Sequence, residues 1–367
     1  MKILLIDDLA DKGWKSILEL AVTKERDSIE IATKQEEAYL KLTNKYDLIF
    51  LDMRLSEEDH KVKNVEEYSG FKLLKYIKKD FTSINFSTPI ILFTASTKIW
   101  NIDKFKEYGV DSFYIKEHPD HIYSTEFSKE NLKNLQSNFM DLIEIGKYRN
   151  EIWSLCYSII ELLNKHNYFN VQDTRSINIK NRIEDKLKLG YGHLFTSTSK
   201  VENDVLLFDK EALSFIIFWS ILEEISKGFT EFNATWNAIY ERSGSWKFKN
   251  KEFFIEYISS EDHCVINYDS YSKKSNQIKE DKKYYNGVIN LSEQIYALLY
   301  AYTDQSDFIR LSDKFREINS FRNKVDYIHS SEKNIFTKNL FDKSEISLKQ
   351  NKILNVLEFI HTILKIN

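Results

Sequence analysis

The chain is poor in proline, glycine and cysteine. Its 367 residues include two prolines, nine glycines and two cysteines. Both prolines, Pro89 and Pro119, lie in the first third of the chain, so the remainder lacks the residue that most strongly interrupts helices. That remainder is rich in Lys, Glu and Leu, which are strong helix formers. We therefore expect long helices there.

The scarcity of cysteine and of long apolar runs excludes several classes of protein. Cys156 and Cys264 form neither a disulfide framework nor a cluster with metal-ligand spacing, which fits a reducing cytoplasm. The opening MKILLIDD has four apolar residues before an acidic pair, too few for a signal peptide. No apolar run approaches the roughly 20 residues that span a bilayer. We expect a cytoplasmic protein that does not enter a membrane.

Neither sign of charge dominates the chain. The formal net charge is −4, with 42% hydrophobic and 29% charged residues, as in a soluble globular protein of two or three domains. This balance provides no general attraction to nucleic acid. Any contact with RNA or DNA must therefore depend on a local basic patch.

A βα repeat is the main pattern in the first third of the chain. Short apolar runs alternate with segments whose apolar residues have helical spacing, which predicts a parallel sheet with right-handed crossovers. The five predicted strands are Ile3–Ile6, Ile29–Ala32, Leu48–Leu51, Ile90–Phe93 and Phe113–Ile115.

Polar side chains follow four of these strands. Asp7 and Asp8 follow the first, Asp52 the third, Thr94 the fourth and Lys116 the fifth. The carboxyl ends of parallel strands meet at one edge of the sheet, where ligands bind. Three carboxylates there would repel one another unless a cation joined them, and Mg²⁺ prefers oxygen ligands. Asp52 could then act as a nucleophile toward a phosphoryl group. The hydroxyl of Thr94 and the ammonium group of Lys116 could bind the phosphoryl oxygens.

Over residues 1–122 this pattern resembles the receiver domain of two-component response regulators. The resemblance implies an α/β doubly wound fold, with a five-stranded parallel sheet of strand order 2-1-3-4-5. It implies that Asp52 is the phosphoacceptor and that a sensor histidine kinase is the phosphodonor. It implies a Mg²⁺ site formed by Asp7, Asp8, Asp52 and the backbone carbonyl of Arg54. It also implies a switch set of Thr94, Lys116 and the aromatic Phe113.

Two features depart from the receiver pattern. The family usually has proline after the lysine, whereas Glu117 follows Lys116 here. The loop from Ser56 to Gly70 is also longer than usual and highly charged. Both departures concern the geometry of switching and leave the acceptor site intact. The alternative is a receiver fold that has lost phosphorylation.

After the receiver we expect a helical linker over residues 123–150 and a mainly helical effector domain over residues 151–367. Apolar residues of the linker recur at helical spacing. In the effector, residues 186–195 (KLKLGYGHLF) contain two glycines and are predicted to form a loop, whereas residues 212–229 predict a buried helix. His193 and His263 have no companion at metal-ligand spacing and are interpreted as surface or hydrogen-bonded histidines.

A second chemical motif lies near the C-terminus. Arg322 and His329 are seven residues apart, which places them on nearly the same face of a helix, and Asn323 adjoins the arginine. An arginine can stabilise charge on phosphorus, and a histidine can transfer a proton near neutral pH. The motif resembles that of HEPN domains, many of which are metal-independent RNases. The resemblance implies a catalytic set of Arg322, Asn323 and His329, with the active site assembled across a homodimer.

Other interpretations of this stretch stay open. Arg322 could pair with Asp326 in an ordinary helical ion pair, and His329 could stabilise the end of the helix. A phosphotransfer helix built on His329 or His361 and a DNA-binding output are further alternatives. Our hypothesis is a receiver that is phosphorylated at Asp52 and controls a homodimeric endoribonuclease. The rival hypothesis is a non-catalytic module whose helical domain binds a partner protein under receiver control.

Overall fold

The computed structural model divides the chain into two compact units. It describes residues 1–24, 26–62, 64–95, 105, 107–117, 125–166, 174–195, 210–229, 244–248, 251–258, 263–267, 279–281, 291–324 and 343–366. Unit 1 consists of Met1–Ser154 together with Phe195, and unit 2 contains the remaining described residues. Within these residues, no helix is long and apolar enough to cross a membrane.

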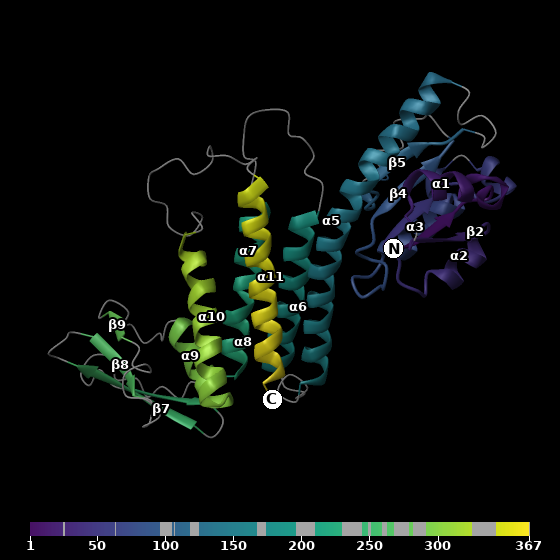
Figure 1. Ribbon diagram of the computed structural model, residues 1–367. Helices are drawn as coiled ribbons and strands as arrows, with labels where there is room; N and C mark the ends of the chain where they lie inside the picture. The colour runs from purple at the N-terminus through teal and green to yellow at the C-terminus, as the bar shows by residue number, and fades with distance from the viewer. Residues whose placement is uncertain are drawn as a thin grey trace, which may run out of the picture. The chain divides into compact units, whose positions relative to one another are not determined.

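Unit 1 is built on a five-stranded sheet in which all neighbouring strands are parallel (Figure 1). The strand order is β2-β1-β3-β4-β5, so the predicted fold class is confirmed. The first and last residues of each predicted strand differ by at most one position from those of the observed strand. The bounds are β1 Lys2–Ile6, β2 Ser28–Ala32, β3 Leu48–Leu51, β4 Ile90–Thr94 and β5 Ser112–Ile115.

Helices cover both faces of this sheet. One apolar core joins the strands to α1 (Trp14–Val22) and to the first part of α5 (Glu126–Lys165). The other joins them to α2 (Gln35–Lys41) and α3 (Ser69–Lys78). Both β3 and β4 are buried along their whole length, and their sequences are continuous apolar runs except for Thr94, which ends β4. Three short 3₁₀ helices complete the unit: η1 Ala10–Lys12, η2 Glu57–His60 and η3 Val65–Glu67.

The first part of α5 is packed against the sheet. Residues 123–150, predicted as a linker, fall in unit 1, and from Glu126 onward they belong to this helix. Gly146 permits the closest approach, since a Cβ atom there would lie 2.5 Å from Cγ of Pro89. The boundary between the units falls inside α5, after Ser154. The apolar residues that this part contributes to the core with the sheet are Leu132, Leu135, Phe139, Leu142 and Ile143.

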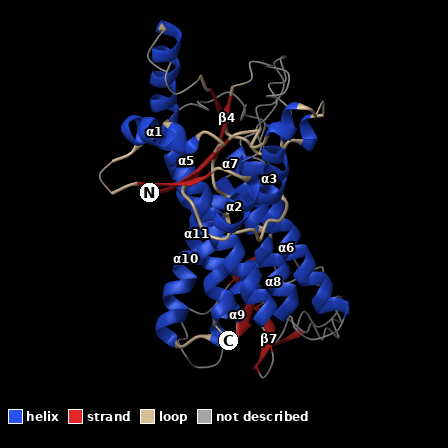
Figure 2. Ribbon diagram, turned by 90° about the vertical axis from the view of Figure 1, so that its right-hand side faces the viewer, coloured by secondary structure: helices blue, strands red, loops and turns tan. Residues whose placement is uncertain are grey.

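Unit 2 is mainly helical, as predicted. The last part of α5 and six further helices form a bundle (Figure 1). Figure 2 shows the same helices in blue, turned by 90°. The bounds are α6 Thr174–Phe195, α7 Lys210–Trp219, α8 Ile221–Phe229, α9 Leu291–Tyr302, α10 Gln305–Lys324 and α11 Lys343–Lys365.

Three features of unit 2 differ from the prediction. Residues 212–229, predicted as one helix, belong to two, α7 and α8, which are separated at Ser220. Residues 186–195 form the end of α6 and not a loop, because Gly190 allows the helix to pack directly against the ring of Phe218. The unit also contains an antiparallel sheet of order β6-β7-β8-β9, which was not predicted. Its strands are β6 Gly244–Phe248, β7 Lys251–Ile258, β8 His263–Asn267 and β9 Lys279–Asp281.

Candidate functional site

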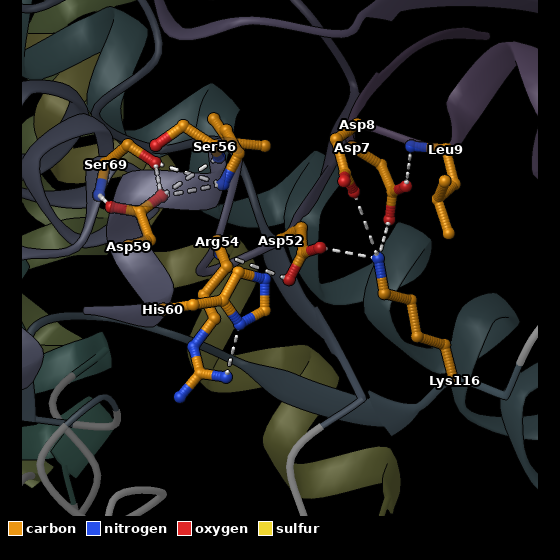
Figure 3. Close-up of polar contacts among 11 residues, drawn as sticks. Asp7, Asp8, Leu9, Asp52, Arg54, Ser56, Asp59, His60, Ser69 and Lys116 are labelled. Carbon is orange, nitrogen blue, oxygen red and sulfur yellow. Dashed lines mark hydrogen bonds and ion pairs between the residues drawn. The ribbon is translucent and has the colours of Figure 1, made fainter. Parts of the chain in front are cut away.

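The predicted acidic cluster forms at the carboxyl edge of the parallel sheet. Lys116, just past β5, places its Nζ atom 2.5 Å from Oδ2 of Asp52, just past β3 (Figure 3). The same ammonium group donates a hydrogen bond to Asp7, which follows β1. Asp8 lies at the solvent side, with Oδ1 4.0 Å from Nζ. Residues from three strands therefore meet at one point, as the sequence predicted.

Backbone contacts hold the carboxylates in place. The amide of Asp52 donates to the carbonyl of Ile6, 2.8 Å away, which extends the ladder between β3 and β1 by one residue. The amide of Leu9 donates to Oδ1 of Asp7 at 2.7 Å. The strands thereby fix where each side chain begins, and the turn after β1 fixes the orientation of Asp7.

Burial and charge act against each other at this site. Burial raises the pKa of Asp52 to about 7; Lys116 opposes this rise, and the nearby Asp7 adds to it. The pKa of Asp7 is also raised, because burial outweighs the effect of Lys116. Burial alone would lower the pKa of Lys116, but the charges of the two carboxylates outweigh burial and raise it. The ammonium group therefore stays charged, while burial favours the protonated form of both carboxylates.

The donor set suits a divalent cation. Asp7, Asp8 and Asp52 each offer a carboxylate oxygen, and these oxygens lie within 4.8 Å of one another. A hard cation such as Mg²⁺ prefers oxygen ligands and keeps several waters, and Asp8 is exposed to solvent on the open side. The residues present therefore fit Mg²⁺. The backbone carbonyl of Arg54 as a further ligand stays a prediction.

The predicted switch residues lie on the neighbouring strands. Thr94 ends β4 and is buried, and its carbonyl accepts a hydrogen bond from the amide of Lys116 at 2.8 Å. Ala95, which follows it, is exposed. Phe113 on β5 is 42% exposed, whereas its neighbour Tyr114 is buried and stacks on Phe93. Roles for Thr94, Lys116 and Phe113 in switching stay predictions.

A buried carboxylate that the sequence analysis missed shapes the long loop after Asp52. Asp59 accepts hydrogen bonds from the amides of Leu55, Ser56 and Ser69 and from the Ser69 hydroxyl (Figure 3). Burial alone would raise the pKa of Asp59, but these hydrogen bonds outweigh it and lower the pKa. The capping box between Ser56 and Asp59 is visible in the sequence as Ser-x-x-Asp and could have revealed this role.

Gly70 brings the end of this loop against the backbone of Asp52. A Cβ atom at Gly70 would lie 2.0 Å from the carbonyl oxygen of Asp52. Beside this contact, the guanidinium of Arg54 donates to the Tyr68 hydroxyl at 3.1 Å and approaches His60 at 3.5 Å. The long loop therefore packs against the residues that follow β3 and lies beside Asp52.

The second predicted site is described only in part. Arg322 lies in α10, and its guanidinium carbon is 4.5 Å from the centre of the Trp219 ring on α7. Asn323 belongs to the same helix, whereas His329 lies outside the described residues, as does Asp326. His361 on α11 lies 2.8 Å from the Ser158 hydroxyl on α5. The described residues therefore place Arg322 in an aromatic contact and leave the catalytic set a prediction.

Comparisons with known proteins give a limited result. No protein-family model matches the sequence, and no curated protein matches it. Among solved structures, the N-terminal part is similar to the Francisella response regulator 1452 receiver domain. The sequence identity is 23%, the match covers 36% of this chain and 97% of the other chain, and the TM-score is 0.24.

Proposed function

We propose that unit 1 is a phosphorylatable receiver whose acceptor is Asp52. The observation that carries the proposal is the joint hydrogen bonding of Lys116 to Asp52 and Asp7 at the carboxyl edge of the sheet, with Asp8 beside them. A buried carboxylate held by one cation, next to two further carboxylates, has the components of phosphoryl transfer to an aspartate: a nucleophile, a cation site and a counter-charge.

The chemistry follows from these components. A carboxylate oxygen of Asp52 attacks the phosphorus of a phosphohistidine or a small acyl phosphate. A P–O bond forms to Asp52, the bond from phosphorus to the donor breaks, and the donor departs with that electron pair. Mg²⁺ bound by Asp7, Asp8 and Asp52 would neutralise charge on the phosphoryl oxygens. Lys116, whose Nζ lies 2.5 Å from Oδ2 of Asp52, would pair with one of those oxygens.

The phosphoryl group would then change the positions of side chains on the neighbouring strands β4 and β5. It adds roughly −1.5 to −2 charge at neutral pH, directly beside the ammonium group of Lys116. Thr94 at the end of β4 would move toward the phosphoryl group, and its hydroxyl would donate a hydrogen bond to a phosphoryl oxygen. The exposed ring of Phe113 would then move into the space that Thr94 leaves. A sensor histidine kinase would supply the phosphoryl group to this protein in the cytoplasm.

For unit 2 we propose an output role under control of the receiver. Its endoribonuclease form requires Arg322 and His329 on one face of a helix, with Asn323 beside the arginine. Two such helices would pair across a homodimer, with RNA as substrate and no metal. The stacking of Arg322 on Trp219 leaves the guanidinium half-buried, a setting in which a cation is held firmly. The rival form is a helical module that binds a partner protein without cleaving RNA.

Labelling with acetyl phosphate tests the receiver proposal. With Mg²⁺ present, the wild-type chain should gain one acid-stable, hydroxylamine-sensitive phosphoryl group, as expected of an acyl phosphate. Asp52→Ala should gain none. Asp11→Asn is the matched control, because Asp11 is an exposed acidic residue of η1. Label that persists in Asp52→Ala, or is lost equally in both variants, contradicts the assignment.

A further inference from the structure

Glu117, which stands where receivers usually have proline, contacts the beginning of α5. The hydroxyl of Ser128 donates a hydrogen bond to Oε2 of Glu117. Ser128 is only 2% exposed, and its own amide donates to Oγ1 of Thr125 at 3.0 Å. The residue directly after Lys116 is therefore bonded to the first turn of the helix that both units share.

A second hydrogen bond reaches the residue on the other side of Lys116. The side-chain amide of Asn131 donates to the carbonyl of Ile115 at 2.7 Å. The two neighbours of Lys116 in the sequence, Ile115 and Glu117, are thus each bound by the first two turns of α5. A displacement of the backbone at Lys116 must either carry these turns with it or break one of the two contacts.

Of the two contacts, the one through Glu117 depends on charge. A carboxylate that accepts a hydrogen bond from a buried hydroxyl makes a stronger bond than a neutral acceptor does. The bond between Glu117 and Ser128 should therefore be stronger than the one that a glutamine at position 117 would make. Lys116 itself is held by Asp7 and Asp52. A phosphoryl group on Asp52 changes the charge that Lys116 faces and so acts on the segment that contains Glu117.

We propose that Glu117 and Ser128 are positioning residues that transmit the phosphorylation state of Asp52 to the first turns of α5. This inference rests on the proposed function. The substitution of glutamate for proline then has a role: it replaces a rigid turn with a hydrogen-bonded link between β5 and the long helix.

The test measures amide hydrogen exchange over residues 125–135 of the full chain, with and without beryllofluoride and Mg²⁺ as a phosphoryl analogue. Wild type should show a change of roughly threefold or more in exchange rate, because exchange at these amides follows the local opening equilibrium of the helix. Glu117→Gln, which keeps the shape and removes the charge, should lose more than half of that response. Ser128→Ala should abolish it, and Ser128→Thr should restore it, because threonine keeps the hydroxyl.

Glu126→Gln is the matched control. Glu126 lies in the same first turn, carries the same charge and pairs only with the exposed Lys129 among the described contacts. Its response to beryllofluoride should equal that of wild type. If the response falls equally in Glu126→Gln and Glu117→Gln, the loss results from removing a negative charge near the N-terminus of the helix and not from the bond to Ser128. This outcome would overturn the inference.

Labelling of the same samples with acetyl phosphate separates the two proposals. If wild type is not labelled at Asp52, the proposed function is wrong. Normal labelling with no change in α5 exchange overturns the inference alone. The inference is also overturned if Glu117→Gln raises the exchange rate without beryllofluoride but keeps the full response of α5 to beryllofluoride. That result would mean that Glu117 only stabilises the structure.

Discussion

Nζ of Lys116 lies 2.5 Å from Oδ2 of Asp52, although the two residues are 64 positions apart in the sequence. The same ammonium group also binds Asp7, so one cation serves two buried carboxylates. A phosphoryl group that joins Asp52 must therefore compete with Asp7 for Lys116. The site is balanced so that a change of charge at one residue alters the partners of another.

Removing the positive charge of Lys116 should slow phosphorylation in a pH-dependent manner. Lys116 lowers the pKa of Asp52 against the effect of burial, so Lys116→Met should raise that pKa and leave less ionised nucleophile at pH 7. We expect labelling by acetyl phosphate to fall on the order of tenfold at pH 7, about one pKa unit's worth, and to regain only part of this loss by about pH 9, since the variant still lacks the ammonium group that would pair with the phosphoryl oxygens. Lys129→Met, at an exposed helical position, should label like wild type. A loss that is constant with pH would contradict this explanation.

The raised pKa of Asp52 should make unit 1 less stable as the pH rises in the absence of a divalent cation. Its pKa is about 7 in the fold against an ordinary 3.8, so the folded state binds the proton more tightly than the unfolded state. The stabilisation is complete below about pH 4 and is lost as the pH rises to about 7. Asp52→Asn, which stays neutral, should therefore melt higher than wild type at pH 8, by roughly 5 °C, but not at pH 4.

Thermal unfolding with a chelator present measures this difference. Addition of Mg²⁺ at pH 8 should raise the melting temperature of wild type and leave Asp52→Asn less affected, since the variant lacks one ligand. A difference between the two proteins that stays the same from pH 4 to pH 8 would rule out titration of Asp52 as its cause.

Asp59 should be essential to the loop that follows the acceptor strand. Asp59→Asn replaces a carboxylate that accepts four hydrogen bonds with a side chain that has one acceptor oxygen. We expect a loss of about 2 kcal/mol in the free energy of unfolding and faster amide exchange at Leu55, Ser56 and Ser69. Because the pKa of Asp59 is lowered, this contribution is present above about pH 4 and falls away at lower pH. Glu57→Gln, on the exposed side of η2, is the control and should change little.

Two glycines in helices should respond in opposite directions to alanine. At Gly146 the new Cβ atom would lie 2.5 Å from Pro89, so Gly146→Ala must push α5 away from the sheet. Overpacking of this kind costs about 1–3 kcal/mol, which exceeds the gain of up to about 1 kcal/mol in helix propensity. At Gly192 in α6 no atom lies within 4 Å of the added Cβ, so Gly192→Ala should stabilise its helix. Native-state exchange of buried amides in β3 and in α6 reports each effect separately.

The endoribonuclease hypothesis makes a prediction that a purely structural role does not. His329→Ala should abolish cleavage of a mixed RNA substrate and leave the melting temperature unchanged. Arg322→Ala should abolish cleavage too, but should also destabilise unit 2 by roughly 0.5–2 kcal/mol through loss of the contact with Trp219. Arg316→Ala, at an exposed position of the same helix, is the control. If phosphorylated wild type, His329→Ala and Arg316→Ala all cleave equally, the RNase hypothesis fails, and binding of a partner protein becomes the output to test.

Some errors of the sequence analysis have a common physical origin. Residues 186–195 contain Gly190 and Gly192, which suggest a loop when only local propensity is considered. In the folded chain Gly190 serves instead to bring α6 against Phe218, a contact with a residue of another helix. Asp59 was overlooked for a similar reason: its partner Ser69 is ten positions away, and only burial makes their contact valuable.

The sequence by itself determined the strands of unit 1 and the edge at which Asp7, Asp52 and Lys116 meet. Each strand is a local apolar run, and parallel βα topology leaves one place for the residues that follow. Only the tertiary structure decided which oxygens Lys116 binds, that Glu117 bonds to Ser128, and that α5 packs along the sheet before it enters unit 2. These contacts join residues far apart in the chain, and their geometry depends on how helices and strands pack, which no local pattern encodes.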